Sequence, residues 1–423
     1  MAIESEVLVV GGGLAGLTSA LAAAREGAEV RLVSYKQSTL RQASGLVDLL
    51  GYTPDGDGPL TDPYEAIPDL PTEHPYSTVG VDTVREAMDL FDDVTDYAGG
   101  HTDTNALVPT HGGTVKPTAR YPRSAAAGLA SDDRDLLLVG FDSMTDFDAP
   151  HAAAHLEAAG VPFDVRGETI RFPGDLRADA KVTRYAKLLD TNGGVAVRGR
   201  ERPAREALAQ RVNPLVDDEQ RVGFPAVLGD DDHAGVRAAL ESKMGVDVFE
   251  VPMGPPSLPG LRLEDRLFAA LDAAGASIET GNPVVDYDGG GRVERVYVEK
   301  NGAEIPMTAD QYVLATGGLV GKGVESDREG VYEPIFDCHV PHSDDRYDWF
   351  DTDAFGDHPF AGFGLRTDDE LRPLGTDEAV EFENLRAAGS VLGGYDFAAE
   401  KSGSGVSIAT GYAAGTSAAA EVR

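Results

Sequence analysis

Runs of consecutive apolar residues alternate with patterns of helical spacing along the chain, and the first such repeat is the clearest. Residues 7–10 form a continuous apolar run, which is typical of a parallel strand buried on both faces. Apolar positions then recur at helical spacing as far as Gly27, a residue type that commonly follows the last residue of a helix. Residues 29–33 supply the next strand. Residues 7–34 therefore predict one uninterrupted βαβ unit.

Three glycines at fixed spacing occupy the turn between this strand and this helix. Gly11 allows the tight turn, Gly13 lets backbone amides approach a phosphate, and Gly16 lets the helix pack closely on the strand. The helix N-terminus then presents unpaired N–H groups and a positive dipole to the anion. In this context the spacing predicts a phosphate-bearing cofactor. The residues expected to contact it are Gly11, Gly12, Gly13, Leu14, Ala15 and Gly16.

The residue at the end of the second strand departs from the usual dinucleotide site. Such sites place an acidic side chain about 20 positions beyond the glycines, where it holds the adenosine ribose. This chain has Ser34 there, followed by Tyr35 and Lys36. The sequence therefore does not predict strong recognition of an adenosine ribose.

The middle of the chain also alternates strands and helices. Residues 134–142 predict a second buried strand and residues 149–160 a helix, but the turn between them lacks the glycine spacing of a nucleotide site. A strand at 225–229, a helix, and a strand at 246–252 repeat the rhythm. Residues 51–75 are rich in Pro, Gly and Asp and predict an irregular excursion from the first unit.

The pattern changes again from Leu261 onward. A helix and a strand lead into a stretch of alternating apolar and polar residues with a glycine turn at 289–291, which predicts a small antiparallel sheet. Residues 312–318 and 384–396 each predict a strand that ends on glycines, where the backbone passes close to something bulky. A helix of small residues follows.

These segments predict an α/β protein with a Rossmann-like nucleotide-binding domain that is discontinuous in sequence. We assign residues 1–50, 255–330 and 376–423 to that domain. Residues 51–254 and 331–375 form an inserted α/β region that we assign to substrate or partner binding.

The charge of the chain is extreme and limits its partners. Acidic residues number 72 against 36 basic ones, which gives a formal net charge of −36, and the acidic runs are scattered instead of forming one tail. Concentrated salt screens most of the resulting self-repulsion, so this balance indicates the cytoplasm of an extreme halophile. Nucleic acid is disfavoured as a partner because neutralising phosphates requires clustered Lys and Arg.

The cysteine content and the apolar runs limit the redox chemistry and the location. Cys338 is the only cysteine, which excludes an intrachain disulfide, an iron–sulfur cluster held by thiolates and a Cys-rich zinc site. Electrons would therefore leave through another subunit or acceptor. The chain has no run of about 18 apolar residues and no signal-peptide pattern. We expect a cytoplasmic protein that reaches the cell membrane only through a partner.

Three segments together resemble the flavoproteins with two dinucleotide-binding domains. They are the glycine turn, the ATGG sequence at 315–318 and the AAGS sequence at 387–390, which leads into an Ala/Gly-rich helix. In that class the C-terminal segment runs along the flavin, and the helix after it points its N-terminus at the flavin pyrimidine carbonyl. The further flavin contacts that the resemblance implies are Ser34, Ser44, Gly45, Gly317, Gly389, Ser390, Gly403 and Gly405.

Four segments narrow this resemblance. The sequences RQASGLVDLLG, HPYS, FGLRTDDELRPLG and ENLRAAGSVLGGYDFAAEKSGSGVSIATGYAAG are similar to the family of B subunits of anaerobic glycerol-3-phosphate dehydrogenase. The resemblance implies an FMN-binding subunit that oxidises sn-glycerol 3-phosphate to dihydroxyacetone phosphate together with a FAD-containing A subunit. It also implies a membrane-associated iron–sulfur subunit that passes electrons to quinone. Ser34 agrees with FMN, which has no adenosine, whereas the glycines alone predict FAD.

Oxidation of glycerol 3-phosphate requires a base at the C2 hydroxyl, the flavin opposite the C–H bond and a cation on the phosphate. Arg372 is the candidate cation; the alternative is a surface ion pair with the acidic residues at 368–370. Lys401 is a candidate for the pyrimidine edge of the flavin; the alternative is a solvated turn lysine. Several histidines in loops could serve as the base. His151 and His155 have helical spacing, but we expect surface histidines and no metal site.

Two further functions stay open at the level of sequence. Ser34 and Ser390, which stand where flavoproteins often have acidic residues, suggest a flavin fold kept to bridge the catalytic and electron-transfer subunits without chemistry of its own. Another flavin-dependent oxidase of the same fold is also compatible with these motifs.

Overall fold

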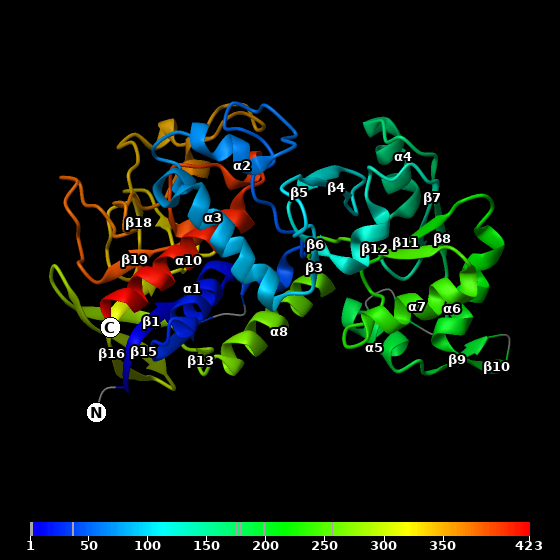
Figure 1. Ribbon diagram of the computed structural model, residues 1–423, viewed down its shortest axis with the longest axis horizontal. Coiled ribbons are helices and arrows are strands. Elements are labelled where there is room, and N and C mark those ends of the chain that lie inside the picture. The colour runs from blue at the N-terminus through cyan, green and yellow to red at the C-terminus, as the bar shows by residue number, and fades with distance from the viewer. Residues whose placement is uncertain (1–2, 36–37, 175, 178–179, 198, 256) are drawn as a thin grey trace. The chain divides into compact units, whose positions relative to one another are not determined.

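The computed structural model describes residues 3–35, 38–174, 176–177, 180–197, 199–255 and 257–423 (Figure 1). The chain falls into two compact units: Met1–Thr39, Asp48–Thr95 and Asp265–Arg423 form the first, and Leu40–Val47 and Asp96–Glu264 form the second. These bounds differ from the domains expected from sequence. Residues 51–95 and 331–375, which were assigned to the inserted region, belong to the first unit. The functions assigned to the two domains stay predictions.

In the described part of the first unit, seven strands form one sheet that mixes parallel and antiparallel pairs. The strands in spatial order are β13 (Ser277–Thr280), β2 (Val30–Ser34), β1 (Ile3–Val10), β16 (Ala303–Leu314), β15 (Val293–Lys300) and β14 (Val284–Gly289), with β19 (Leu385–Ala387) also paired to β16. The first four are parallel to one another, as is β19, whereas β14, β15 and the start of β16 are antiparallel. This arrangement confirms the predicted βαβ unit, the predicted antiparallel sheet and the fold class.

The register brings four strand ends to one edge of the sheet. Val10 is paired with Val33 on one side and with Leu314 on the other, and Leu314 is paired with Ala387. Because these strands are parallel, the segments that follow them all leave the sheet at its carboxyl edge, where open α/β sheets usually bind ligands.

Two helices of small residues pack closely together beside this sheet. They are α1 (Leu14–Arg25) and α10 (Gly403–Glu421), and α3 (Pro75–Val94) packs on α10. A Cβ atom on Gly411 would lie 2.6 Å from the carbonyl oxygen of Ala15, and one on Gly415 would lie 2.2 Å from that of Ser19. The glycines of α10 therefore let the two backbones approach each other.

No helix in the described residues of either unit is long and apolar enough to cross a bilayer.

The remaining elements of the first unit are short. They are α2 (Pro63–Ala66), η2 (Ile67–Asp69), β17 (Glu325–Ser326), β18 (Val331–Tyr332), η5 (Arg346–Asp348), η6 (Pro359–Gly362), η7 (Gly389–Val391) and α9 (Phe397–Glu400). The chain passes from one unit to the other within η1 (Thr39–Gln42), after Val47, after Thr95 and within α8 (Leu258–Ala273).

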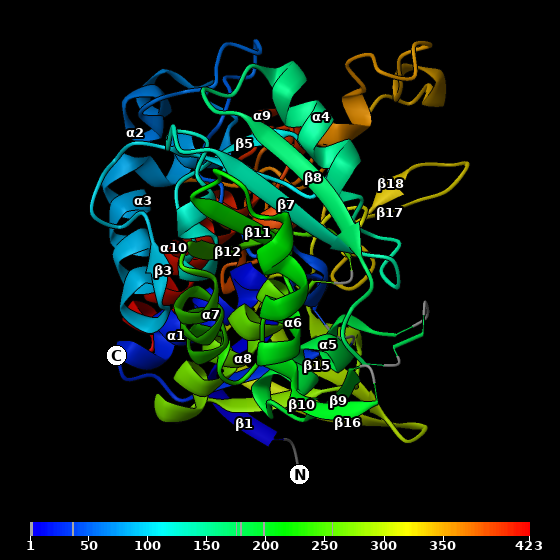
Figure 2. The same ribbon diagram turned by 90° about the vertical axis from the view of Figure 1, so that its right-hand side faces the viewer.

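The described part of the second unit contains a parallel sheet of four strands (Figure 2). Their spatial order is β12 (Asp247–Val251), β11 (Arg221–Pro225), β7 (Leu136–Phe141) and β8 (Val165–Ile170). The helices are α4 (Ala149–Ala159), α5 (Val182–Asp190), α6 (Ala204–Val212) and α7 (His233–Met244). Short pairs and turns complete it: β3 (Tyr97–Ala98) with β6 (Tyr121–Pro122), β4 (Ala106–Pro109) with β5 (Val115–Thr118), β9 (Gly194–Val197) with β10 (Arg200–Pro203), η3 (Arg123–Gly128) and η4 (Asn213–Leu215).

One strand of this sheet lies earlier than the sequence predicted. The expected strand at 225–229 is wrong, because β11 ends at Pro225. Residues 226–228 stay buried after the strand has ended. An apolar run therefore marked burial here and not the strand itself, an ambiguity that is common for short apolar segments.

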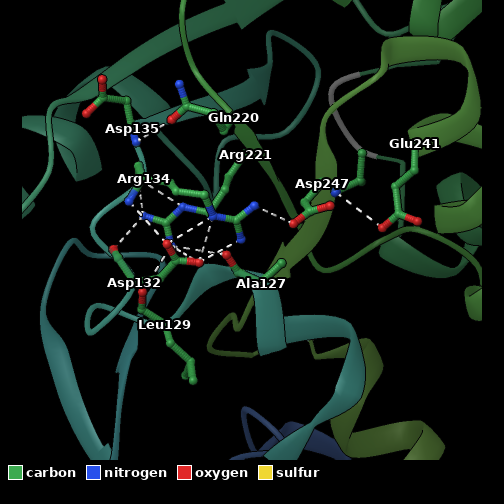
Figure 3. A network of polar contacts seen from close by, with 10 residues as sticks. Ala127, Leu129, Asp132, Arg134, Asp135, Gln220, Arg221, Glu241 and Asp247 are labelled. Carbon is green, nitrogen blue, oxygen red and sulfur yellow. Dashed lines mark hydrogen bonds and ion pairs between the residues drawn. The ribbon is translucent and has the colours of Figure 1, made fainter.

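A wholly buried arginine fixes the start of β11 (Figure 3). The Arg221 guanidinium donates hydrogen bonds to the carbonyl oxygens of Ala127, Leu129, Asp132 and Arg134 and lies 4.6 Å from the ring centroid of Phe163. The donors of this buried side chain are thus paired with backbone acceptors, as buried polar groups require.

An ion pair beside this arginine continues the network (Figure 3). Arg134 contacts Asp132 and Asp247, each at 2.7 Å. The hydrogen bond from Arg134 lowers the pKa of Asp132 to about 2, so Asp132 stays ionised beside the two arginines at any pH near neutrality. The network connects the loop before β7 with the starts of β11 and β12.

A buried carboxyl group in the first unit makes stability depend on pH. Glu333 is 1% exposed and accepts backbone N–H bonds from Ile335 at 3.0 Å and Phe336 at 2.6 Å. Burial outweighs these bonds and raises the pKa of Glu333 from 4.5 to about 7. A raised carboxyl pKa means that the folded chain holds a proton that the unfolded chain releases. The stabilisation is therefore complete below pH 4.5 and is lost as the pH rises through 7.

We expect Glu333→Gln to remove this dependence. Between pH 5 and pH 8 the free energy of unfolding of the variant should gain up to about 3 kcal/mol relative to the parent chain. Denaturant unfolding at several pH values, at one fixed salt concentration, measures this difference. A difference between the two proteins that stays constant with pH would contradict the assignment.

Candidate functional site

The glycine turn lies where β1 ends and α1 begins, and two of its glycines are required by close packing. Gly11 has φ of +118°, and a Cβ atom there would lie 2.1 Å from the carbonyl oxygen of Ala315. A Cβ atom on Gly16 would lie 1.9 Å from the carbonyl oxygen of Gly11. Gly11 thus permits the tight turn and Gly16 the close approach of the helix, as the spacing predicted.

The third glycine of the motif faces open space. Gly13 is the N-cap of α1, and no described residue outside its immediate neighbours comes within 4 Å of a Cβ atom built on it. Among the described residues, Gly13 caps the helix without any side-chain hydrogen bond to its first N–H groups. The N-terminal N–H groups and dipole of a twelve-residue helix therefore lie at an open position on the carboxyl edge of the sheet, which fits a phosphate.

Ser34 ends β2 and is packed against the same turn. It is 7% exposed, and a Cβ atom on Gly12 would lie 2.7 Å from its Oγ atom. Its backbone carbonyl accepts the N–H of Gly281 at 2.8 Å. The position that holds an acidic side chain in many dinucleotide sites is thus occupied here by a small side chain in contact with the glycine turn.

The ATGG and AAGS segments meet beside this turn. The N–H of Gly318 donates to the Ser390 Oγ atom at 3.1 Å, and Gly317 has φ of +88°. Gly389 has φ of +77°, and a Cβ atom there would lie 2.6 Å from the Cβ atom of Ala15. The structure therefore brings three motifs that are far apart in sequence to one place, and Ser390 is positioned by a hydrogen bond to the protein itself.

The N-terminus of α10 carries the glycines predicted to lie near the flavin ring. A Cβ atom on Gly405 would lie 2.1 Å from the Tyr76 hydroxyl, and the N–H of Gly405 donates to the carbonyl oxygen of Asp48 at 2.7 Å. Gly403 begins the helix and packs near Phe397. Packing within the protein therefore requires glycine at 405. Contact of Gly403 and Gly405 with a cofactor stays a prediction.

The two residues proposed for chemistry both have partners within the protein. Arg372 donates to Asp368 at 2.7 and 2.9 Å and lies 3.3 Å from Glu370, which is the ion pair named as its alternative. The hydrogen bond to Asp368 raises the pKa of Arg372. Lys401 has φ of +53°, and its Nζ atom donates to the carbonyl oxygen of Ala398 in the same turn. A catalytic role for either side chain stays a prediction.

Ser44 and Gly45 belong to the second compact unit. Gly45 has φ of +79°, and a Cβ atom there would lie 2.5 Å from Pro259 in α8. The Ser44 Oγ atom accepts the N–H of Leu46 at 3.4 Å. Their contact with a flavin stays a prediction.

The two helical histidines, His151 and His155, lie side by side on α4 with ring centroids 4.0 Å apart.

Comparison with known proteins places these features in a family. Residues 6–406 match the family model described as FAD binding domain. A probable B subunit of anaerobic glycerol-3-phosphate dehydrogenase from Halobacterium salinarum is 75% identical over 421 residues, which cover 99% of each chain. The corresponding B subunit from Yersinia pestis is 30% identical over 424 residues, which cover 96% of each chain. The chain belongs to the family of B subunits of anaerobic glycerol-3-phosphate dehydrogenase.

Membership of this family makes the chain one component of an oxidoreductase complex, which implies that other subunits exist. The match to an FAD binding domain indicates a flavin, and favours FAD over the FMN expected from the resemblance. Among solved structures, a 3-ketosteroid-Δ4-(5α)-dehydrogenase from Rhodococcus jostii aligns with a TM-score of 0.39 at 14% identity, covering 99% of this chain and 97% of that one.

A buried polar network behind α10 was missed by sequence reasoning. His74 and Glu400 are 0% and 2% exposed, and the His74 Nε2 atom lies 3.1 Å from a Glu400 oxygen. Because His74 Nδ1 accepts the N–H of Tyr76 at 3.0 Å, Nε2 carries the proton and donates to Glu400. Glu400 also accepts the hydroxyl of Ser402 at 2.9 Å, the residue that precedes α10.

This network joins the N-terminus of α3 to the N-terminus of α10, and thus positions the helix end expected at the flavin. The signal in the sequence was HPYS, in which a histidine precedes a proline at the first turn of a helix. HPYS contributed to the family resemblance, but pattern reasoning gave it no role, because its partner lies 326 residues away.

We expect Glu400→Ala to destabilise the first unit. The change leaves buried donors of His74 and Ser402 without acceptors, and each such group costs about 1–3 kcal/mol. Thermal unfolding of the variant, beside Glu65→Ala at an exposed position as the control, measures the effect. Equal unfolding temperatures for both variants would refute the structural role of the network.

Proposed function

We propose that this chain is a flavin-binding subunit of an anaerobic glycerol-3-phosphate dehydrogenase and takes part in oxidising sn-glycerol 3-phosphate to dihydroxyacetone phosphate. The observation that carries the proposal is the convergence of the glycine turn, Gly317 and Gly318, and Gly389 and Ser390 at the carboxyl ends of β1, β16 and β19. Close approach of backbone at three chain segments is what a bulky, phosphate-bearing cofactor requires.

We infer FAD as the flavin, because the matched family is an FAD binding domain. Residues 11–16 would hold its phosphates at the N-terminus of α1, and residues 389–390 and the start of α10 would lie along the remainder. FMN is the alternative, favoured by the serine at position 34 in place of an acidic residue. When bound, the flavin supplies the acceptor for the hydride removed from C2 of the substrate.

We assign Arg372 to the substrate phosphate, with Asp368 holding its guanidinium in a fixed orientation through two hydrogen bonds. Lys401 is assigned to the pyrimidine edge of the flavin. It has a left-handed backbone conformation and lies two residues before α10, the helix expected to point at that edge. The partners are a FAD-containing A subunit and a membrane-associated iron–sulfur subunit that passes electrons to quinone. The complex would lie at the cytoplasmic face of the cell membrane.

A second function is that of a bridging subunit that takes up flavin weakly or not at all. It is favoured by the engagement of both Arg372 and Lys401 with groups of the protein, which leaves each side chain fewer donors for a substrate. In that case the fold would serve to hold the catalytic and electron-transfer subunits together.

Acid extraction of the purified protein, followed by chromatography of the released chromophore, tests these functions. We expect stoichiometric FAD, whereas FMN would correct the identity of the flavin alone. A colourless protein that takes up neither flavin on reconstitution would refute the flavin-binding function and favour the bridging role. Reduction of an artificial dye by glycerol 3-phosphate, with and without this chain added to the A subunit, then measures its share in the reaction.

A further inference from the structure

Exposed apolar side chains gather in one segment of the first unit. Among the described residues, nine large apolar side chains are exposed, and six of them lie between positions 320 and 360. Phe355 is 99% exposed and Val320 is 80% exposed. Single exposed apolar residues are ordinary on a protein surface, whereas a concentration of them marks a binding site. The six residues are Val320, Tyr332, Tyr347, Phe350, Phe355 and Phe360.

A cavity of about 500 Å³ opens in the same place. Its polar lining residues are Lys322, Glu325 and Ser326, and the rest of the lining is apolar. A volume of this size is within the range of sites that take up a small molecule, so it has room for a large apolar side chain. The apolar lining residues are Leu319, Val324, Val331, Trp349, Phe350, Phe360 and Phe363.

The cavity is held open by contacts within the protein. The Trp349 indole N–H donates to the carbonyl oxygen of Ser343 at 2.7 Å, and its ring lies edge-on to His342 and Phe363 at 5.7 and 6.1 Å. The backbone of Trp349 also accepts the N–H of Phe360 at 3.0 Å. Because these contacts fix the wall in advance, little ordering is needed when a ligand enters.

The segment that supplies Trp349 and Phe350 to the cavity wall is acidic. Residues 343–358 contain six aspartates and one arginine, which is a stronger imbalance than the two-to-one ratio of the whole chain. Asp345 and Asp353 each accept the backbone N–H two residues further on, those of Tyr347 and Phe355. These turns direct the chain so that Tyr347 and Phe355 stand in solvent, at 66% and 99% exposure.

We propose that this aromatic surface, defined as residues 319–332 and 343–363, docks another protein subunit of the dehydrogenase. The partner would insert an apolar side chain into the cavity and place Lys or Arg residues against the aspartates. This inference rests on the partner subunits named under the proposed function. Protein interfaces commonly have an apolar centre surrounded by polar residues. A few buried aromatic or arginine side chains then contribute most of the binding energy.

Charge distinguishes this occupant from two others. A second copy of the chain, related by a twofold axis, would bring the same aspartates face to face, and like charges across an interface cost affinity. A membrane surface that carries anionic lipids would bring its negative charges into contact with the same aspartates, at a distance where salt screens least. Of the three, a basic protein partner gains from both the apolar cavity and the acidic segment at 343–358.

Co-expression of the tagged full chain with the other subunits of its dehydrogenase tests the proposal. Phe355→Ser changes a side chain that is almost wholly exposed, and Phe350→Ser changes the cavity wall; Val285→Ser, on β14 and 39% exposed, is the control. We expect each aromatic variant to bind the partner subunits at least tenfold more weakly, with unchanged flavin content and unfolding temperature, and the control to bind as the parent does.

Several results would overturn this docking site. Equal binding by Phe355→Ser, Phe350→Ser and the control would do so, as would loss of self-association by the aromatic variants in light scattering while the partner subunits still bind. Binding of the parent chain, but not of Phe355→Ser, to vesicles of phosphatidylglycerol would assign the surface to lipid instead. Because flavin content is measured on the same samples, failure of the flavin-binding proposal would be recognised separately.

Discussion

Replacement of Gly13 by glutamate is expected to abolish flavin binding while the chain stays folded. Gly13 has φ of −77° and ψ of −178°, a conformation that any residue can adopt, and a Cβ atom there meets nothing within 4 Å among the described residues. A carboxylate at a helix N-terminus is favourable for the helix itself. The substitution therefore occupies the phosphate position without a steric cost to the fold.

The expected size follows from electrostatics. The helix N-terminus attracts a phosphate, whereas a glutamate carboxylate beside it would repel one, and such like-charge contacts cost several kcal/mol. The Kd for the flavin should therefore rise by about 100-fold or more, beyond what a purified protein retains. Flavin fluorescence titration of the reconstituted protein measures the Kd, and circular dichroism reports the fold.

Gly13→Gln is the matched control, because glutamine has the same shape and no charge. We expect it to weaken binding far less than glutamate does. Gly16→Ala serves as the opposite control, since its Cβ atom would lie 1.9 Å from the Gly11 carbonyl oxygen and should disrupt the turn itself. Full retention of flavin by Gly13→Glu would mean that the turn does not bind a phosphate.

The second large effect is expected in the other unit. Arg221→Met should lower the free energy of unfolding by about 3–5 kcal/mol. The change removes the donors for the carbonyl oxygens of Ala127, Leu129, Asp132 and Arg134, which lie in a half-buried loop, and leaves an apolar side chain in the wholly buried position of the guanidinium (Figure 3). It also leaves Asp132 with one cation in place of two.

Arg123→Met is the control for this experiment, because Arg123 is 58% exposed and forms a surface ion pair with Asp96. Such a pair is worth about 0–1 kcal/mol. Thermal unfolding should separate the two variants by on the order of 10 °C, given about 2–4 °C per kcal/mol for a unit of this size. Similar unfolding temperatures for the two variants would show that the buried network contributes little.

Local patterns were enough to predict several elements and the purpose of some glycines. The predicted βαβ unit is β1, α1 and β2, and Gly16 makes the close contact that its position in the motif requires. These features depend on residues near one another in sequence, where burial and backbone conformation leave a periodic record. The strand predicted at 225–229 failed because burial continued beyond Pro225 after the hydrogen-bonded ladder had ended.

The candidate site was predicted in part. Its three segments were found because each is a strand followed by glycines, but the partner of each side chain could not be predicted. Nothing in the local sequence indicates that Ser390 accepts the N–H of Gly318 or that His74 donates to Glu400. For Arg372 both outcomes were open, and the structure contains the ion pair with Asp368.

The sequence by itself determined the family, the α/β class and the position of the glycine turn, because these depend on short-range spacing and on motifs that fold locally. The tertiary structure decided which distant segments meet, which residues form each compact unit, and which side chains are used by the protein itself. Those outcomes depend on contacts between residues tens to hundreds of positions apart, as between His74 and Glu400, and such contacts leave no periodic signal in the chain. Gly13 combines the two: its spacing marked it, and its open surroundings give it room for a phosphate.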